Sequence, residues 1–302
     1  LYVVPINWGN TNWTSEDTPE RRWFDELIGK TQAFINNKGK FDMSIQVTIP
    51  NEWEKMADVN IGVTAGIETN RVSPEWIKKS QLMDRIIVPS SHSKNVFEST
   101  VYEAKNEQTG EVTKDFRCKT PIAVVPYPAK PVEPADIDLE LDYDFNFLTV
   151  AQWGPRKNLE NTIRWFLESF KDKEVGLVLK TNLAKNCIID RRVCTHKLKE
   201  ITGEYPDRKC KVYMLHGYMT AAEMSALYNN PKIKSYITAT HGEGYGLPIF
   251  EAAYYGMPII APGWSGHVDF LYHEVKDKKG KSRVKPMFSK VDFRIKPIKK
   301  EA

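Results

Sequence analysis

Residues 241–266 read HGEGYGLPIFEAAYYGMPIIAPGWSG, and this segment is the most informative part of the chain. A glycine-rich loop leads into a predicted helix at 248–255, because proline suits the first turn of a helix and Gly-Met-Pro suits its end. Apolar runs at 235–240 (SYITAT) and 258–261 (PIIA) predict a strand on each side. The unit is strand, loop, helix, strand, which is typical of an α/β protein with a parallel sheet.

Two carboxylates, Glu243 and Glu251, flank the start of this helix. The free N–H groups and the positive end of the helix dipole favour a phosphate there, and Gly244 and Gly246 let the backbone approach a ligand closely. Carboxylates repel phosphate, so two of them suggest hydrogen bonds to the vicinal hydroxyls of two polyols on either side of a diphosphate. Taken singly, Glu243 is equally compatible with a solvated loop residue, and Glu251 with a glutamate favoured by the dipole.

The spacing of the two glutamates, the intervening GYGLP and the trailing GMPIIAPGWSG resemble the E-x7-E signature of retaining GT-B glycosyltransferases, family 4 (glycosyltransferases group 1). The resemblance implies an α/β fold with two Rossmann-like domains facing each other across a cleft. It also implies that Glu251 binds the nucleotide ribose, that Glu243 faces the donor sugar, and that the backbone of Gly244, Tyr245, Gly246 and Leu247 contacts sugar or diphosphate.

The stretch 144–170, DFNFLTVAQWGPRKNLENTIRWFLESF, resembles the first strand, loop and helix of the family's donor domain. In the family, an arginine just after the strand and a lysine before Asn-Leu neutralise the leaving diphosphate. Lys157 matches the lysine, but Gln152 stands where the arginine is usual, in a loop that includes Gly154. Arg156, or Lys180 at the end of a predicted strand at 175–180, are the candidates for the missing charge.

The N-terminal part resembles the family's acceptor domain through 41–50, 61–69 and 84–97. Ser73 followed by Pro74 predicts a helix start. Glu68 follows the strand that begins at Ile61, and the strand at 85–88 is followed by a second loop. The acceptor-side candidates are therefore Glu68, Ser91 and His92. Of these, we take His92 as an N-terminal-turn residue rather than a catalytic base.

The expected organisation is an acceptor-side domain at 1–128, a linker rich in proline and acidic residues at 129–144, and a donor domain with a basic tail at 145–302. No glycine-rich loop follows a first strand, although Trp8-Gly9-Asn10 resembles a degenerate one. The chain begins with leucine, and about 50 residues follow Glu251. We therefore expect a GT-B chain shortened at both ends, as a short variant or a fragment.

The formal net charge is +4, but residues 276–302 alone hold 11 Lys or Arg and 3 Asp or Glu. The basic excess therefore belongs to the tail. It fits a solvated hairpin around Lys279-Gly280-Lys281, a weak contact with a membrane surface, or contacts to a polyanionic acceptor. Aromatic residues are too sparse there for stacking on nucleic acid, so no nucleic-acid partner is expected.

The cysteines are Cys118, Cys187, Cys194 and Cys210, and none has C-x-x-C spacing. A zinc site from three of them with His196 is an unfavoured alternative, and reduced thiols in a cytoplasmic protein are the default. The Asp-x-Asp pairs at 136–138 and 142–144 lie in or beside the linker, so no metal is expected. No apolar run approaches the length needed to span a bilayer.

The sequence therefore predicts transfer of a sugar from a nucleotide-diphosphate sugar to a carbohydrate or other hydroxyl acceptor, with retention and without metal or cofactor. Two alternatives stay open. One is another GT-B enzyme, such as a nucleotide-sugar epimerase or a phosphorylase, although no distinctive pyridoxal-lysine motif is present. The other is a catalytically weakened nucleotide-sugar binding protein, which Gln152 favours.

Overall fold

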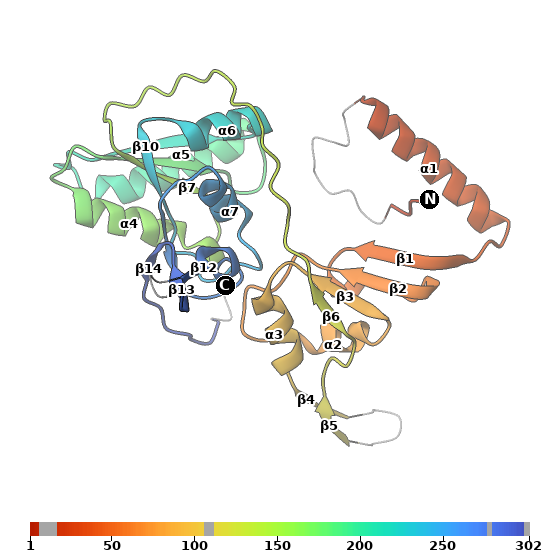
Figure 1. Ribbon diagram of the computed structural model, residues 1–302. Coiled ribbons are helices and arrows are strands. Elements are labelled where there is room, and N and C mark those ends of the chain that lie inside the picture. The colour runs from red at the N-terminus through yellow and green to blue at the C-terminus, as the bar shows by residue number, and fades with distance from the viewer. Residues whose placement is uncertain (6–16, 106–111, 277–279, 299–302) are drawn as a thin grey trace.

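The computed structural model describes residues 1–5, 17–105, 112–276 and 280–298. Helices and strands form two α/β units, each built on its own parallel sheet (Figure 1). The predicted Trp8-Gly9-Asn10 loop lies outside the described residues. The expected α/β class with two Rossmann-like parallel sheets is confirmed.

The smaller sheet has the order β1-β2-β3-β6, and all its pairings are parallel. Its strands are β1 (Phe41–Val47), β2 (Ala57–Val63), β3 (Arg85–Val88) and β6 (Ile122–Val124). A core of Trp53, Ile77, Ile86 and Phe97 fills one face. The elements on that side are the 3-10 turn η2 (Pro50–Glu52), α2 (Pro74–Ser80) and α3 (Ser91–Ser99).

In β1 the usual pattern of buried apolar and exposed polar side chains is reversed. Met43, Ile45 and Val47 are 56%, 63% and 76% exposed, whereas Gln46 is buried. The buried amide of Gln46 is hydrogen-bonded to the backbone of Glu54, so burial leaves no unmet polar group there. The first helix, α1 (Pro19–Asn36), contacts the start of this strand through packed aromatic rings.

The larger sheet has the order β14-β11-β10-β7-β8-β9. Successive residues of its central strands face opposite sides: Phe147 packs in the core with α4 and α5, and Leu148 packs in the core with α6 and α7. Such strands are buried on both faces, as expected for a parallel sheet with helices on both sides. Its strands are β7 (Asn146–Val150), β8 (Gly176–Thr181), β9 (Lys211–His216), β10 (Ile233–Ile237), β11 (Ile259–Pro262) and β14 (Ser289–Val291). Its helices are η3 (Pro155–Lys157), α4 (Leu159–Phe170), α5 (Ile188–Gly203), α6 (Ala221–Asn229), α7 (Leu247–Tyr254) and α8 (Val268–Leu271).

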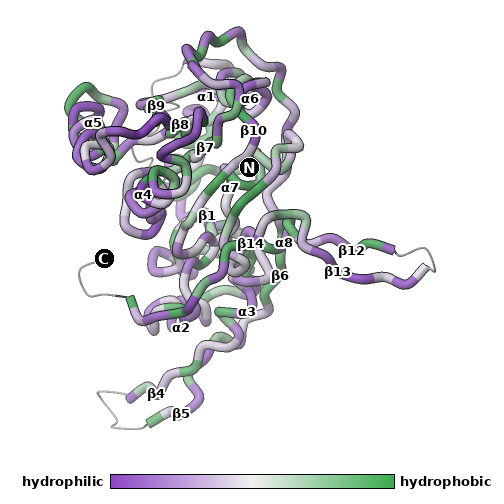
Figure 2. Tube along the Cα trace, turned by 90° about the vertical axis from the view of Figure 1, so that its left-hand side faces the viewer, coloured by the Kyte–Doolittle hydropathy of each residue, from purple (hydrophilic) through white to green (hydrophobic). Residues whose placement is uncertain are grey.

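Two antiparallel hairpins extend from the body, as Figure 2 shows. They are β4 (Tyr102–Lys105) with β5 (Val112–Phe116), and β12 (Tyr272–Lys276) with β13 (Ser282–Pro286). The second pair flanks the turn predicted around Lys279-Gly280-Lys281, of which Lys279 lies outside the described residues. Residues 125–145, which join the units, contain no helix or strand. Among the described residues, no helix combines the length and apolar character needed to cross a membrane.

The predicted helix start at Ser73 is confirmed, whereas several other helix and strand boundaries differ from the predicted ones. Ser73 caps α2 as predicted. The helix predicted at 248–255 begins one residue earlier, because Gly246 adopts a left-handed φ of +90° as its N-cap. β2 begins at Ala57, four residues before the predicted start. β10 spans 233–237 rather than 235–240, because the chain turns after Ile237 into the loop that carries the candidate site.

The capping box at the start of α6 tests the local stability of the larger unit. Thr220 accepts from the N–H of Glu223, and the carboxylate of Glu223 accepts from the N–H of Thr220. Thr220→Ala removes the cap and should lower the free energy of unfolding by about 1 kcal/mol, whereas Thr220→Ser should keep most of it. Urea unfolding of both variants measures this, and equal losses would contradict a side-chain cap.

Candidate active site

The candidate site lies at the carboxyl edge of the larger sheet, where the loops after β7 and β10 meet. Asn158, at the end of the first loop, adopts a left-handed φ of +54°, and its side-chain amide donates to the carbonyl of Ala239 at 2.9 Å. The N–H of His241 donates to the carbonyl of Arg156 at 2.8 Å. Because β7 and β10 are adjacent strands, these bonds join the two loops that carry the predicted charged residues.

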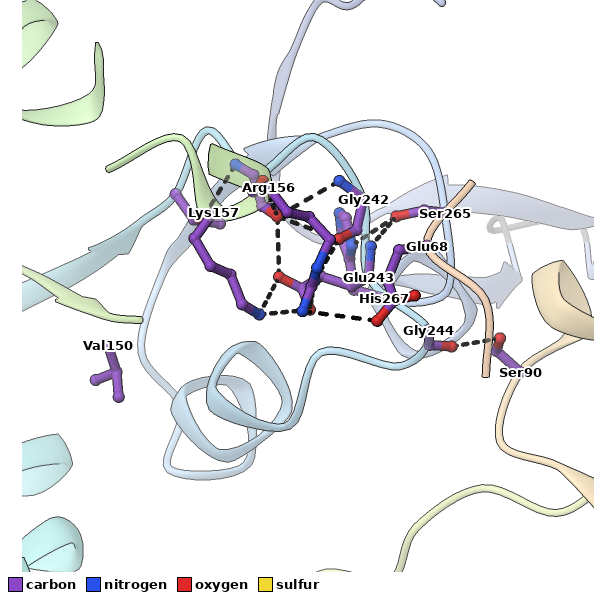
Figure 3. Close-up of polar contacts among 12 residues, drawn as sticks. Glu68, Ser90, Val150, Arg156, Lys157, Gly242, Glu243, Gly244, Ser265 and His267 are labelled. Carbon is purple, nitrogen blue, oxygen red and sulfur yellow. Dashed lines mark hydrogen bonds and ion pairs between the residues drawn. The ribbon is translucent and has the colours of Figure 1, made fainter. Parts of the chain in front are cut away.

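The carboxylate of Glu243 is the centre of the site, and Figure 3 shows the side chains that converge on it. The Lys157 ammonium lies 2.6 and 2.7 Å from its two oxygens, and Nη1 of Arg156 lies 3.2 Å from Oε2. The hydroxyl of Thr240 donates to Oε1 at 2.9 Å. Glu243 is only 7% exposed, so this buried carboxylate is fully partnered.

Arg156 also links the two units. Its Nη1 donates to the carbonyl of Gly242 at 2.9 Å, and its Nη2 lies 3.6 Å from the carboxylate of Glu68 in the smaller unit. Both side chains of this second pair are about two-fifths exposed, so the ion pair itself adds little stability. Two cations thus face two carboxylates, and an incoming anion would have to compete with Glu243.

The two units meet backbone to backbone at glycines. The hydroxyl of Ser90 donates to the carbonyl of Gly244 at 2.6 Å (Figure 3). A Cβ placed on Gly66 would lie 2.9 Å from Cα of Gly244, and a Cβ on Gly244 would lie 2.6 Å from the carbonyl oxygen of Ala65. Neither position accepts a side chain without separating the units, so close approach explains both glycines.

The other acceptor-side candidates, Ser91 and His92, lie along the same boundary. The N–H of Ser91 donates to the carboxylate of Asp269. Nε2 of His92 is 3.1 Å from the carbonyl of Thr69, and its ring meets that of Trp264 edge to face at 5.4 Å. Burial lowers the pKa of His92, and a neutral ring that donates to a carbonyl through Nε2 is consistent with a packing role.

Glu251 lies on α7 and accepts a hydrogen bond from the hydroxyl of Tyr228 at 2.9 Å. Burial raises the pKa of Glu251. Gly246 and Leu247 form the cap and first residue of this helix. Tyr245 is buried, and its ring packs against those of Tyr127, Phe250 and Phe270. In this part of the site the side chain of Tyr245 therefore stabilises the loop.

Two other candidates, Gln152 after β7 and Lys180 near the end of β8, contact groups other than Glu243. The Gln152 amide donates to the carbonyl of Leu183 at 2.6 Å, and the Lys180 ammonium donates to the carbonyl of Gly217. Burial lowers the pKa of Lys180. Gly154 precedes η3 as its N-cap and has extended backbone, and a Cβ there would meet no atom within 4 Å. Four residues were candidates for contacts to the diphosphate: Gln152, Arg156, Lys157 and Lys180. Among the described residues, only Arg156 and Lys157 of these four contact Glu243.

A second buried polar cluster, on α5 and β9, differs from the cysteine set weighed in the sequence. The Asp190 carboxylate accepts from the backbone N–H groups of residues 183–185, and Nε2 of His216 lies 2.7 Å away. Burial acts to raise the pKa of Asp190, but these hydrogen bonds outweigh it and hold that pKa well below its usual value. Burial raises the pKa of Cys194 beside it to about 11, so the thiol is protonated. Cys187 and His196 are exposed elsewhere. The cluster is a hydrogen-bonded support for the loop after β8.

The sequence interpretation missed three residues that contact or support Glu243 in the candidate site: Thr240, Ser265 and His267. The hydroxyl of Ser265 accepts from the N–H of Glu243 at 3.0 Å and lies 3.3 Å from Nδ1 of His267. For Ser265 and His267 the signal was the segment Trp-Ser-Gly-His, which is separated by two residues from the end of the strand predicted at 258–261 and lies at the same sheet edge as the signature.

No protein-family model matches this chain, and no curated protein matches its sequence. Solved structures do. Sucrose-phosphate synthase from Thermosynechococcus elongatus matches with a TM-score of 0.53 at 13% identity, over 85% of this chain and 65% of that one. The E. coli trehalose-6-phosphate structure bound with UDP-2-fluoro glucose matches with a TM-score of 0.52 at 12% identity, over 84% and 66%.

The pneumococcal O-GlcNAc transferase GtfA, in complex with UDP and GlcNAc, gives a TM-score of 0.48 at 14% identity, over 82% of this chain and 47% of that one. The chain thus spans about half to two thirds of the length of these proteins. At such identity the likeness to sucrose-phosphate synthase and to the E. coli structure shows the fold alone, and that fold is the GT-B fold of glycosyltransferases.

Burial of His267 generates a pH prediction. Burial lowers its pKa, and the groups around it are the Glu243 carboxylate, the Lys157 ammonium and the His92 ring. A histidine held neutral in the folded state contributes stability above its unfolded pKa of 6.5, and that contribution is lost as the pH falls toward the lower folded pKa. The free energy of unfolding in urea should therefore fall between about pH 7.5 and about pH 5.5, with His92 adding in the same direction.

The variant His267→Gln should show a shallower fall than the wild type, because one buried titrating group is gone. His241, which is exposed, supplies the matched control, and His241→Gln should keep the wild-type slope. An unchanged slope in His267→Gln would contradict the assignment.

Proposed function

We propose that this chain transfers a sugar from a nucleotide-diphosphate sugar to a hydroxyl acceptor with retention of configuration. The carrying observation is the buried Glu243 carboxylate, held by Lys157 and Arg156 beside the N-terminus of α7. Two cations at a helix N-terminus suit a diphosphate, and a carboxylate among them suits the hydroxyls of the attached sugar. The GT-B fold and the E-x7-E spacing support this, as does UDP-2-fluoro glucose in the E. coli relative in fold.

In the proposed complex the diphosphate takes the cations that Glu243 now occupies. The Glu243 carboxylate then accepts hydrogen bonds from the donor sugar, and backbone groups of Gly244 and of residues 245–247 contact sugar or phosphate. We assign Glu251 to the ribose, because its only described side-chain partner is the Tyr228 hydroxyl and its second oxygen has a hydrogen-bonding position to offer. The acceptor would enter from the smaller unit, past Glu68.

The proposed chemistry makes one C–O bond and breaks another on the same face of the sugar. The acceptor hydroxyl attacks the anomeric carbon as the bond to the diphosphate breaks, and the hydroxyl proton passes to an oxygen of the departing diphosphate. Negative charge grows on the leaving group, so Lys157 and Arg156 stabilise the transition state more than the ground state. No divalent cation enters this scheme, since the two side chains supply the positive charge.

A catalytically weakened nucleotide-sugar binding protein is the second candidate, and one observation favours it. Gln152, at the position where the family usually has arginine, donates to the carbonyl of Leu183 and brings no charge. Arg156 carries a guanidinium to the site from four residues further along the chain. Whether this relocated charge sustains turnover distinguishes an enzyme from a binder.

A donor screen tests binding. Ligands that bind the folded state raise its apparent stability, so UDP-, GDP- and ADP-sugars are compared by thermal shift with and without EDTA. One nucleotide class should raise Tm, and Glu251→Ala should weaken its binding by about 1–3 kcal/mol, the cost of removing a charged hydrogen-bond partner. No shift with any donor contradicts the proposal, and an unchanged affinity in Glu251→Ala contradicts the ribose assignment.

Steady-state kinetics test the electrostatic role. Lys157→Met and Arg156→Met should each lower kcat by about tenfold or more while changing KM less, because the lost interaction strengthens as the leaving group gains charge. Lys173→Met, an exposed lysine after α4, is the matched control and should behave as wild type. Thermal unfolding checks that Lys157→Met still folds, since it removes a partner of a buried carboxylate. Wild-type kcat in both site variants would favour the binder.

A further inference from the structure

Ser265 has a backbone conformation that serine rarely adopts. Its φ is +74°, and in the described part of the chain only Lys38 and Asn158 share a positive φ among residues other than glycine. The left-handed region is unfavourable for an L-residue because its Cβ crowds the backbone, whereas glycine adopts this region freely. Ser265 is also 3% exposed, so solvation of its hydroxyl does not explain the choice of serine. A buried residue in a strained conformation beside a candidate site indicates that its side chain has a role there.

The hydroxyl of Ser265 is the middle link of a buried hydrogen-bond chain. It accepts from the N–H of Glu243 at 3.0 Å and lies 3.3 Å from Nδ1 of His267. Nε2 of His267 lies 2.7 Å from the carbonyl of Pro262. A carbonyl can only accept, so Nε2 carries the proton, Nδ1 is the acceptor, and the Ser265 hydroxyl donates to it. The neutral ring matches the pKa of His267, which burial lowers.

Ser265 and the adjacent Gly266 together pair both backbone polar groups of Glu243, its N–H and its carbonyl. The N–H of Gly266 donates to the carbonyl of Glu243 at 2.8 Å. A Cβ on Gly266 would lie 2.0 Å from the carbonyl oxygen of Gly244, so the two loops are in direct contact. The loop after β11 therefore fixes the position of Glu243 from behind, while its carboxylate points the other way, toward Arg156 and Lys157 (Figure 3).

We propose that Ser265 and His267 are positioning residues that hold the Glu243 backbone still while its carboxylate moves from the two cations to the donor sugar. The inference rests on the proposed function, which requires that exchange. A carboxylate that changes partners needs a fixed Cα, because a shift of about 1 Å at a reacting site costs as much as 10²-fold in rate. Strain at Ser265 is then the cost of placing a hydroxyl where glycine would leave the Glu243 N–H unpaired.

Two substitutions separate the hydroxyl from the strain. Ser265→Gly and Ser265→Ala both lose the hydroxyl, but glycine adopts the φ of +74° without a Cβ and alanine does not. The glycine variant should therefore be the more stable of the two in urea. His267→Gln is the third variant, because it breaks the chain one link further from Glu243.

The first readout needs no ligand. Amide hydrogen exchange at Glu243 should be about tenfold or more faster in Ser265→Gly than in wild type, because the N–H loses its buried hydrogen-bond acceptor. Wild-type protection of this amide in a folded Ser265→Gly protein would overturn the proposal.

The second readout is the affinity gained by adding the sugar, measured by calorimetry as the ratio of Kd values for the free nucleoside diphosphate and for the matching nucleotide sugar. All three variants should bind the nucleotide as wild type does, yet lose about tenfold of the sugar's contribution, because the ribose and the sugar use different glutamates. A purely structural role would lower stability and leave this ratio unchanged, and that result would overturn the proposal. If wild type itself gains nothing from the sugar, the proposed function fails instead, and the exchange rates still show whether the chain holds Glu243.

Discussion

The rest of the site depends on the pairing of the buried Glu243 carboxylate. A carboxylate that is almost fully removed from water must be paired, and its partners, Lys157 and Arg156, belong to the loop after a different strand. The pairing therefore requires the loops after β7 and β10 to lie together, which adjacent positions in the sheet allow. The left-handed backbone at Asn158, and the hydrogen bond from its side-chain amide to the carbonyl of Ala239, also hold these two loops together. In this state the cations are already neutralised, so an anionic ligand exchanges places with Glu243 rather than entering an empty positive site.

A steric constraint acts beside the electrostatic one. The units approach each other at Gly66 and Gly244 so closely that neither position accepts a Cβ, and Gly242 approaches the backbone of Glu68 in the same way. The hydroxyl of Ser90 then pairs with the carbonyl of Gly244, which the contact would otherwise bury without a partner. This boundary brings Glu68 and His92 beside the signature loop. Small residues on both sides thus place the acceptor-side candidates and the proposed donor site together.

Several elements followed from short-range chemistry and were predictable. The caps at Ser73 and Thr220 depend on residues three positions apart, and the two-sided burial of β7 and β8 follows from their continuous apolar runs. Lys157 and Arg156, proposed as cations of the donor site, both pair with Glu243 in the loop after β10. Lys180, at the end of a strand of the same sheet, was proposed to supply charge there, and Gln152 stands where the resemblance places an arginine. Instead each bonds to a nearby carbonyl, since a long polar side chain takes the partner that the local turn provides.

Local patterns in the sequence were sufficient for the α/β class and for the helix start near Pro248. They also placed two glutamates, Glu243 and Glu251, eight positions apart, which is the basis of the resemblance to the E-x7-E signature. These depend on local backbone preferences and on periodicity, which any short window contains. Which groups pair depends on the tertiary structure, because the hydrogen bonds from the N–H of Glu243 to the Ser265 hydroxyl and from the Ser90 hydroxyl to the carbonyl of Gly244 join residues 22 and 154 positions apart. Such contacts depend on how strands are ordered in a sheet and how two units meet, and no local pattern carries that information.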